Sequence, residues 1–252
     1  MSVMKKTFLA GAGALLLTTA IAGGFNSVNA QEKAYSDPAF GEAVRAYLLE
    51  NPQVIVEAMD EYQANQQEIE AKKFEQTLSE KLDVLHDPSA PFAGNPDGEI
   101  VIVEFFDYNC GYCKRAIGDI QTIIEKEKDV KIIFKEMPIL SESSLDAARY
   151  ALAAHKQGKY FEYHTELMNF RGTKNAESLE KIAADLGLDV EQMKKDADSE
   201  EIRNEIKTSL ELSRDLGIRG TPAFIVDDTL SPGYLPYAQM KGVIAEARKN
   251  KS

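Results

Sequence analysis

The sequence predicts an α/β fold that carries an inserted helical subdomain and is preceded by a helical N-terminal extension. Three observations lead to this prediction. A strand, a helix and a second strand follow one another between residues 99 and 134, only helical patterns occupy residues 144–216, and a further strand follows at 223–226. With 252 residues, of which 44% are hydrophobic, the chain can bury a sizeable core.

The first 30 residues have the composition of an export signal. Lys5 and Lys6 precede an apolar stretch over residues 8–25, and Val28-Asn29-Ala30 then offers a cleavage site. An uncleaved membrane anchor is the alternative, because the apolar stretch approaches spanning length, although glycines dilute it. We therefore predict a signal peptide at residues 1–30 and a periplasmic location for the mature protein.

The charge of the chain argues against nucleic acid as a partner. The whole sequence has a net charge of −12, and loss of residues 1–30 leaves 27 basic against 41 acidic residues, a net charge of −14. Nucleic-acid-binding proteins instead present basic surfaces. An acidic surface suits a soluble exported protein.

The segment after the signal predicts two helices. Asp37-Pro38 is typical of an N-cap and first-turn proline for a helix over residues 39–49. Asn51-Pro52 is a second such pair, and an uninterrupted helical pattern follows it from Gln53 to about Leu85. Apolar positions form a seam suited to helix pairing, which then shifts phase by one residue. The seam residues are Ile55, Met59, Tyr62, Gln66 and Ile69, followed by Phe74, Leu78, Leu82 and Leu85.

This seam has two interpretations. It is either an oligomerisation helix or one amphipathic helix folded back on its own domain, and the phase shift marks a stutter or a bend. Turn signals are dense over residues 86–98 and predict a domain boundary. We predict a helical extension at 31–87 that mediates oligomerisation, and a second domain at 88–252 with its helical insertion at about 140–217.

The second domain alternates strand and helix signals before the insertion. A buried strand is predicted over residues 99–106, a helix opens at the cysteine motif, and a second strand covers 130–134. Residues 231–236 are rich in turn signals. Further helices are predicted over 144–157, 160–169, 176–186, 190–196, 200–216 and 237–249.

Two cysteines, Cys110 and Cys113, are the strongest chemical signal. A structural disulfide would enclose only two residues and so would constrain the unfolded chain little. A half zinc site is the other alternative, but zinc needs four ligands, and His86, His155 and His164 have no ligand spacing to the pair. A Cys-x-x-Cys motif between a strand and a helix instead predicts redox chemistry, with Cys110 at the helix N-terminus as the attacking thiol and Cys113 as the resolving thiol.

Two segments carry a family resemblance. They are Glu104-Phe105-Phe106-Asp107-Tyr108-Asn109-Cys110-Gly111-Tyr112-Cys113 and Gly217-Ile218-Arg219-Gly220-Thr221-Pro222-Ala223-Phe224. Over roughly residues 98–249 the chain resembles the DsbA family of proteins with a thioredoxin-like fold. The extension resembles that of oligomeric members related to suppressor-of-copper-sensitivity C proteins, some of which are trimeric isomerases.

The resemblance assigns roles to residues that have other interpretations. It implies a buried acid beneath the pair at Glu104, where the alternative is a charge on a partly exposed strand face, although apolar neighbours favour burial. It implies a cis peptide bond at Thr221-Pro222 facing the cysteines, where the alternative is a trans turn proline. Tyr112 either contacts substrate or covers the pair. Helical core is favoured over a peptide groove for Tyr160, Phe161, Tyr163 and Phe170.

The expected reaction is thiol–disulfide exchange through a redox-active Cys110–Cys113 disulfide. No organic cofactor or metal is implied. The expected partners are exported proteins with cysteines, a membrane redox partner that recycles the pair, and further copies of the chain, with a trimer as one form.

Isomerisation or reduction is predicted over oxidation. The Cys-Gly-Tyr-Cys motif departs from the Cys-Pro-His-Cys of the best-known oxidases, and Tyr112 offers no positive charge to favour the thiolate. Several active sites in one oligomer also hold a substrate at high effective concentration. The alternatives are a dithiol oxidase, a chaperone or surface protein that keeps the fold without turnover, and a glutathione-dependent transferase. Retention of both cysteines disfavours the last two.

Overall fold

The computed structural model describes residues 37–251, so the predicted signal peptide lies outside the described residues. The chain forms two compact units that divide between Gln67 and Glu68. The elements are α2 (Pro38–Glu50), α3 (Gln53–Leu85), β1 (Phe92–Gly94), β2 (Ile100–Phe106), α4 (Gly111–Lys126), β3 (Val130–Glu136), α5 (Glu142–Lys156), α6 (Tyr160–Asn169), α7 (Ala176–Asp185), α8 (Val190–Ala197), α9 (Glu200–Asp215), β4 (Ala223–Val226), β5 (Thr229–Pro232) and α10 (Tyr237–Lys251).

In the first unit, α2 begins and ends where the sequence predicts. The Asp37 side chain accepts a hydrogen bond of 2.9 Å from the backbone N–H of Ala39, and Pro38 occupies the first turn. Asn51 ends the helix, because both its backbone and side-chain N–H groups donate to the Tyr47 carbonyl. No residue of α2 is buried.

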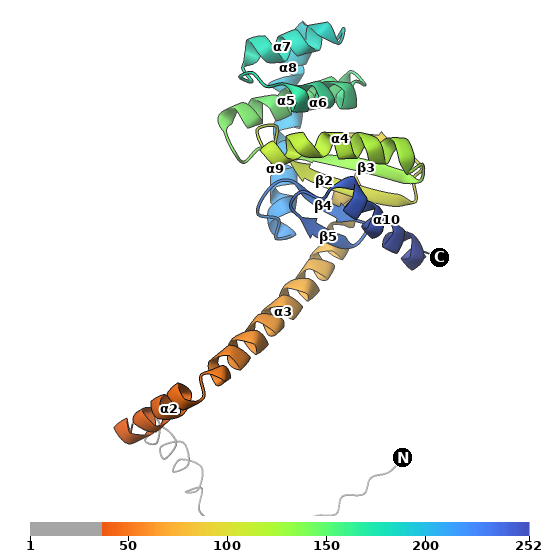
Figure 1. Ribbon diagram of the computed structural model, residues 1–252. Coiled ribbons are helices and arrows are strands. Elements are labelled where there is room, and N and C mark those ends of the chain that lie inside the picture. The colour runs from red at the N-terminus through yellow and green to blue at the C-terminus, as the bar shows by residue number, and fades with distance from the viewer. Residues whose placement is uncertain (1–36, 252) are drawn as a thin grey trace, which may run out of the picture. The chain divides into compact units, whose positions relative to one another are not determined.

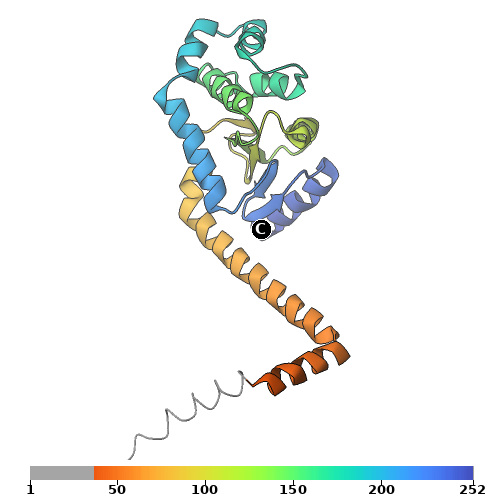
Figure 2. The same cartoon turned by 90° about the vertical axis from the view of Figure 1, so that its left-hand side faces the viewer.

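Helix α3 is continuous through the phase shift of its seam. Ile55, Met59 and Tyr62, before the shift, are each more than half exposed, whereas Leu78 and Leu85, after it, are buried. The later turns therefore belong to the core of the second unit. Lys81 forms an ion pair of 3.1 Å with Asp215, and in Figure 2 the last turns of α3 lie beside α9.

The second unit contains one five-stranded sheet in the order β1-β3-β2-β4-β5. Strands β2 and β3 are parallel, as predicted, and the other pairs are antiparallel. The sequence analysis missed both edge strands. It assigned β1 to the turn-rich segment 86–98, and it assigned part of β5 to the turn-rich segment 231–236. Strands of three and four residues are too short to show a hydrophobic period, and their pairing with β3 and β4 defines them.

Side chains of the central strand β2 point alternately to the two faces of the sheet, and each face has its own hydrophobic core. Ile102 and Phe106 face the core that α4 and α10 cover, which also extends into the helical subdomain. Val103 and Phe105 face the core that α3 and α9 cover, with Leu78 and Leu85 among its members. Burial of both faces explains why β2 is almost continuously apolar in sequence.

Helices α5 to α9 lie between β3 and β4 in sequence and form the predicted helical insertion, and α5 to α8 gather beyond one end of the sheet in Figure 1. Side chains cap the N-termini of α5, α7, α8 and α9, where Ser141, Asn175, Asp189 and Ser199 each accept a backbone N–H of the first turn. The predicted fold class is confirmed: a thioredoxin-like α/β fold with inserted helices and a helical N-terminal extension. Within residues 37–251, no helix has the length and apolar character needed to cross a membrane.

Candidate active site

The turn before the cysteine motif is fixed by one carboxylate. Asp107 directly follows strand β2, and its side chain accepts hydrogen bonds from the Asn109 N–H at 2.7 Å and the Ser144 hydroxyl at 2.7 Å. It also accepts the backbone N–H groups of Ile139 and Leu140 at 2.9 and 3.0 Å. Asp107 therefore ties the motif to the segment after β3 and to the start of α5. The sequence analysis quoted Asp107 only within the motif, although an aspartate two residues before an asparagine is a signal for such a turn.

Cys110 is the N-cap residue of α4 and retains extended backbone angles. Its side chain is 8% exposed, and its Sγ lies 3.2 Å from the Thr221 carbonyl oxygen, to which the thiol donates when it is protonated. The thiol of Cys113, as a hydrogen-bond donor, lowers the pKa of Cys110 to about 5, assisted by backbone N–H groups at the start of the helix and opposed by burial. Cys110 is therefore almost entirely a thiolate at neutral pH, which is the form that attacks disulfides.

Cys113 lies one turn into α4 and is 1% exposed. Burial raises its pKa well above that of a free thiol, and the neighbouring Cys110 and Glu104 raise it further. Both cysteines are free thiols in this structure. The pair is thus chemically unequal, with an ionised sulfur near the surface and a protonated sulfur behind it.

Glu104 lies on β2, on the face that packs under α4, and its side chain is fully buried. Neither carboxyl oxygen has a hydrogen-bond partner among the described residues. Burial, and then the charge of Cys110, raise the pKa of Glu104 to about 8. A carboxyl with this pKa exchanges a proton near neutral pH, as a general acid–base group must.

Thr221 and Pro222 connect α9 to β4, and the peptide bond between them is cis. Strand β4 pairs with β2 in a register that sets Ala223 opposite Phe105, which brings this connection to the end of the sheet that bears the motif. The Pro222 carbonyl accepts from the Gly233 N–H at 2.9 Å. The backbone N–H of Thr221 donates to no described residue, so it is available to a ligand.

Tyr112 is 60% exposed. Its ring stacks on that of Tyr234, with centroids 6.1 Å apart. Tyr234 is held by a hydrogen bond of 2.6 Å from its hydroxyl to Asp119 and by Arg115, which lies 5.0 Å above its ring. The sequence analysis did not single out Tyr234, because this contact joins segments more than 120 residues apart.

His155 and the aromatic residues of α6 make structural contacts. His155 contacts the Ser89 carbonyl at 2.9 Å. Within the described residues no group of three or more His, Cys, Asp or Glu side chains could hold a metal ion. Tyr160 and Tyr163 are buried, in agreement with the helical-core interpretation, and the partly buried Phe161 packs against the same core. Phe170 is half-buried.

A buried polar network lies behind the motif and was missed by the sequence analysis. Tyr108 and Tyr160 both donate their hydroxyls to one oxygen of Glu136, at 3.2 and 2.9 Å, and Tyr108 also contacts His164 at 3.0 Å. Burial raises the pKa of Glu136 well above its ordinary value and lowers that of His164 to about 3. The network is therefore neutral, and it joins the strands to α6.

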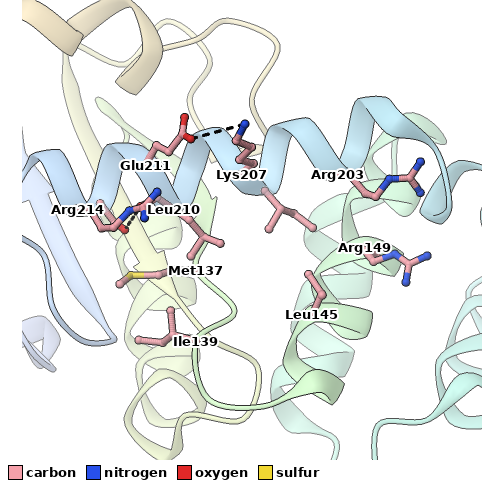
Figure 3. Close-up of a pocket in the computed structure, with 11 residues that line it drawn as sticks. Met137, Ile139, Leu145, Arg149, Arg203, Lys207, Leu210, Glu211 and Arg214 are labelled. Carbon is pink, nitrogen blue, oxygen red and sulfur yellow. Dashed lines mark hydrogen bonds and ion pairs between the residues drawn. The ribbon is translucent and has the colours of Figure 1, made fainter.

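A hollow of about 570 Å³ lies between α5, α9 and the segment after β3 (Figure 3). Its apolar side chains include Met137, Ile139 and Leu210. Arg149 and Arg203 stand at one end, and both bind Asp198, Arg149 through its carboxylate and Arg203 through its carbonyl. These charges are thus compensated within the helical subdomain.

Comparison with known proteins agrees with this geometry. Residues 101–245 match the DSBA-like thioredoxin domain. The chain belongs to this DSBA-like family. Residues 38–68 match the N-terminal domain of the copper resistance protein ScsC, so the DSBA-like domain follows an ScsC-type N-terminal domain. The family is one of thiol–disulfide oxidoreductases.

Solved structures and curated relatives support the same assignment. The DSBA-like chain is 43% identical to a thioredoxin-like oxidoreductase from Silicibacter pomeroyi DSS-3, over 66% of this chain and 97% of that one, with a TM-score of 0.64. It is 31% identical to Proteus mirabilis ScsC in a transitional conformation, over 88% and 99%, with a TM-score of 0.64.

Among curated proteins, disulfide bond formation protein D of Bacillus subtilis (strain 168) is 25% identical over 64% of this chain and 78% of its own. Na(+)/H(+) antiporter NhaA 1 of Mycobacterium sp. (strain KMS) is 29% identical over 53% of this chain. The DSBA-like chain spans only 23% of that antiporter's length.

Proposed function

We propose that the protein is an exported, periplasmic thiol–disulfide oxidoreductase that acts on disulfides of folding proteins. The observation that carries this proposal is the unequal cysteine pair, with the Cys110 thiolate at the start of α4 and the protonated Cys113 buried behind it. The export pattern at residues 1–30 supports the location.

The reaction begins when the Cys110 thiolate attacks one sulfur of a substrate disulfide. The substrate S–S bond breaks, a mixed disulfide forms, and the second substrate sulfur leaves as a thiolate that takes a proton. Cys113 then transfers its proton to Glu104 and attacks the Cys110 sulfur. This releases the reduced substrate and leaves a Cys110–Cys113 disulfide, so two electrons pass to the substrate. A membrane redox partner would return them.

The backbone N–H of Thr221 and the exposed ring of Tyr112 serve as substrate contacts in this scheme. Thr221 lies at the reacting sulfur, because its carbonyl accepts from Cys110, and its N–H is unpaired among the described residues. An extended substrate segment gains a main-chain hydrogen bond there. Neither an organic cofactor nor a metal takes part.

Isomerisation is the favoured direction, because the Cys-Gly-Tyr-Cys motif lacks the histidine that favours the reduced thiolate form in Cys-Pro-His-Cys oxidases, so the couple should be less oxidising. We expect equilibration with a glutathione buffer to give a potential near the roughly −180 mV of protein disulfide isomerase. The oxidase alternative requires a potential close to about −120 mV.

The two residues between the cysteines offer a test of direction. We expect a Gly111→Pro, Tyr112→His variant to become more oxidising by about 30 to 60 mV, because a histidine stabilises the Cys110 thiolate and hence the reduced form. The site tolerates the change, since Gly111 is the first residue of α4 and an added Cβ would meet no atom within 4 Å. Glutathione equilibration measures the shift, and the single Gly111→Pro variant is the control for the backbone change. An unchanged potential in the double variant would contradict this account of direction.

Self-association through the extension is the second part of the proposal. The apolar side chains of the first unit are exposed, with Met59 at 51% and Tyr62 at 59%. We expect residues 31–252 to form an oligomer at micromolar concentration and a Met59→Lys, Tyr62→Lys variant to raise the dissociation constant at least about 100-fold, since both lysines would be buried in the interface. Light scattering measures this. The exposed pair Glu57→Lys, Glu61→Lys is the matched control, and a monomeric parent protein would refute the prediction.

A further inference from the structure

A large cleft adjoins the reacting sulfur in the second unit. Its volume is about 830 Å³, and all the residues that line it lie between Glu70 and Gly233. Thr221 and Pro222 form part of its lining, and the Thr221 carbonyl is itself the hydrogen-bond acceptor of Cys110. A polypeptide held at Cys110 therefore has this cleft within reach.

Helix α3 supplies one wall of the cleft. Ala71, Lys73 and Phe74 line it from the helix, opposite the connection from α9 to β4 and the edge strand β5. The wall is anchored, because Leu78 is buried in the core beneath it and Lys81 pairs with Asp215. The helix that continues from the extension is thus also a fixed part of the catalytic unit.

The floor of the cleft is apolar where it meets this wall. Phe74 and Leu230, both half-buried, line the cleft and pack against the core that contains Ile218. Charged side chains, including Lys73 and Asp228, stand around it. Such a surface favours a large apolar side chain from a chain segment that is not yet folded.

We propose that Phe74 and Ala71 of α3 determine which polypeptides the enzyme accepts. The occupant is an extended segment of a substrate protein that carries a large apolar side chain within two residues of its disulfide-bonded cysteine. In an extended segment alternate side chains point to opposite sides, so a cysteine at Cys110 sets a near neighbour toward α3. This inference rests on the proposed thiol–disulfide exchange and adds a substrate class to it.

The test compares two disulfide-bonded peptides that differ only in a leucine or a serine beside the cysteine. With reduced protein of residues 31–252, the kcat/KM for reduction should be about 10-fold higher for the leucine peptide. Phe74→Ser and Ala71→Glu should each bring this ratio close to one, because the first removes the apolar contact and the second places a charge in the cleft. Both peptides react with the same cysteine pair. A change in the reactivity of that pair therefore cancels in the ratio of the two kcat/KM values.

Leu82→Ser is the matched control, since Leu82 lies on the same helix, is 43% exposed and does not line the cleft. It should keep the parent ratio. Should Phe74→Ser fail to fold, Ala71→Glu decides, because Ala71 is exposed. A ratio near one in the parent protein, or a parent-like ratio in Ala71→Glu, would overturn the assignment. Glutathione disulfide is the third substrate: a parent protein that reduces neither peptide nor glutathione disulfide would instead refute the proposed function.

Discussion

Replacement of Cys110 by serine is expected to abolish thiol–disulfide exchange, with a loss of more than about 1,000-fold in insulin reduction, because a serine hydroxyl is not a nucleophile near neutral pH. The structure makes the effect specific to this position. Cys110 has a pKa of about 5, whereas burial keeps Cys113 protonated, so Cys113 cannot substitute for it. Insulin reduction at the parent rate by Cys110→Ser would show that another group attacks the substrate.

Substitutions of Cys113 separate its two roles, as the resolving thiol and as a hydrogen-bond donor to Cys110. Cys113→Ser keeps a hydroxyl donor beside Cys110 but cannot resolve a mixed disulfide, so substrate should accumulate on Cys110. Cys113→Ala also loses the donor that contributes most to the low pKa of Cys110, and that pKa should rise toward the free value of about 8.5. Mass spectrometry of the trapped adduct and thiolate absorbance against pH measure the two effects. Equal Cys110 pKa values in both variants would show that the Cys113 donor is not the cause.

Local signals in the sequence predicted most of the fold. Caps and prolines such as Asp37-Pro38 gave the helix bounds, since they act within one turn of the helix they start. The edge strands β1 and β5 were missed because three or four residues carry no period, and only their neighbours in the sheet define them. The sequence left open whether α3 mediates oligomerisation or folds back on its own domain, and it did not predict that exposed positions before the phase shift would give way to Leu78 and Leu85 in the core after it.

In the candidate active site, too, residues with a local sequence signal were predictable, and residues that depend on contacts between distant segments were not. The cysteine pair was predictable from four consecutive residues and a strand-to-helix context. Pro222, 112 residues from Cys110, was found through a family resemblance and not through any local pattern. The stacking of Tyr112 on Tyr234 and the cleft wall at Phe74 depend on contacts between distant segments, and no short sequence signal encodes them.

Glu104 is expected to reduce the stability of the protein at neutral and alkaline pH. Its pKa is about 8 in the folded protein and about 4.3 in an unfolded chain. A raised folded-state pKa means that its contribution to stability is fully present below pH 4.3 and is lost as the pH rises through 8. The free energy of unfolding of Glu104→Gln, relative to that of the parent, should therefore increase with pH by about 1.4 kcal/mol per pH unit across this window. The total increase should be about 5 kcal/mol. Denaturant unfolding of the reduced proteins at several pH values measures this gain, and a constant difference between pH 4 and 9 would contradict the burial of an unpaired carboxyl.

The same substitution should slow catalysis while it stabilises the fold. Cys113 must lose its proton before it attacks the mixed disulfide, and a glutamine cannot accept that proton, so resolution should slow by about 100-fold while the first attack by Cys110 continues. Rapid quenching would then show a mixed disulfide that the parent protein does not accumulate. Glu136→Gln is the control, because Glu136 is also a buried carboxyl with a raised pKa but binds Tyr108 and Tyr160 instead of facing the cysteine pair. It should change the pH dependence of stability without any accumulation of mixed disulfide, and an equal slowing in both variants would assign the effect to packing and not to proton transfer by Glu104.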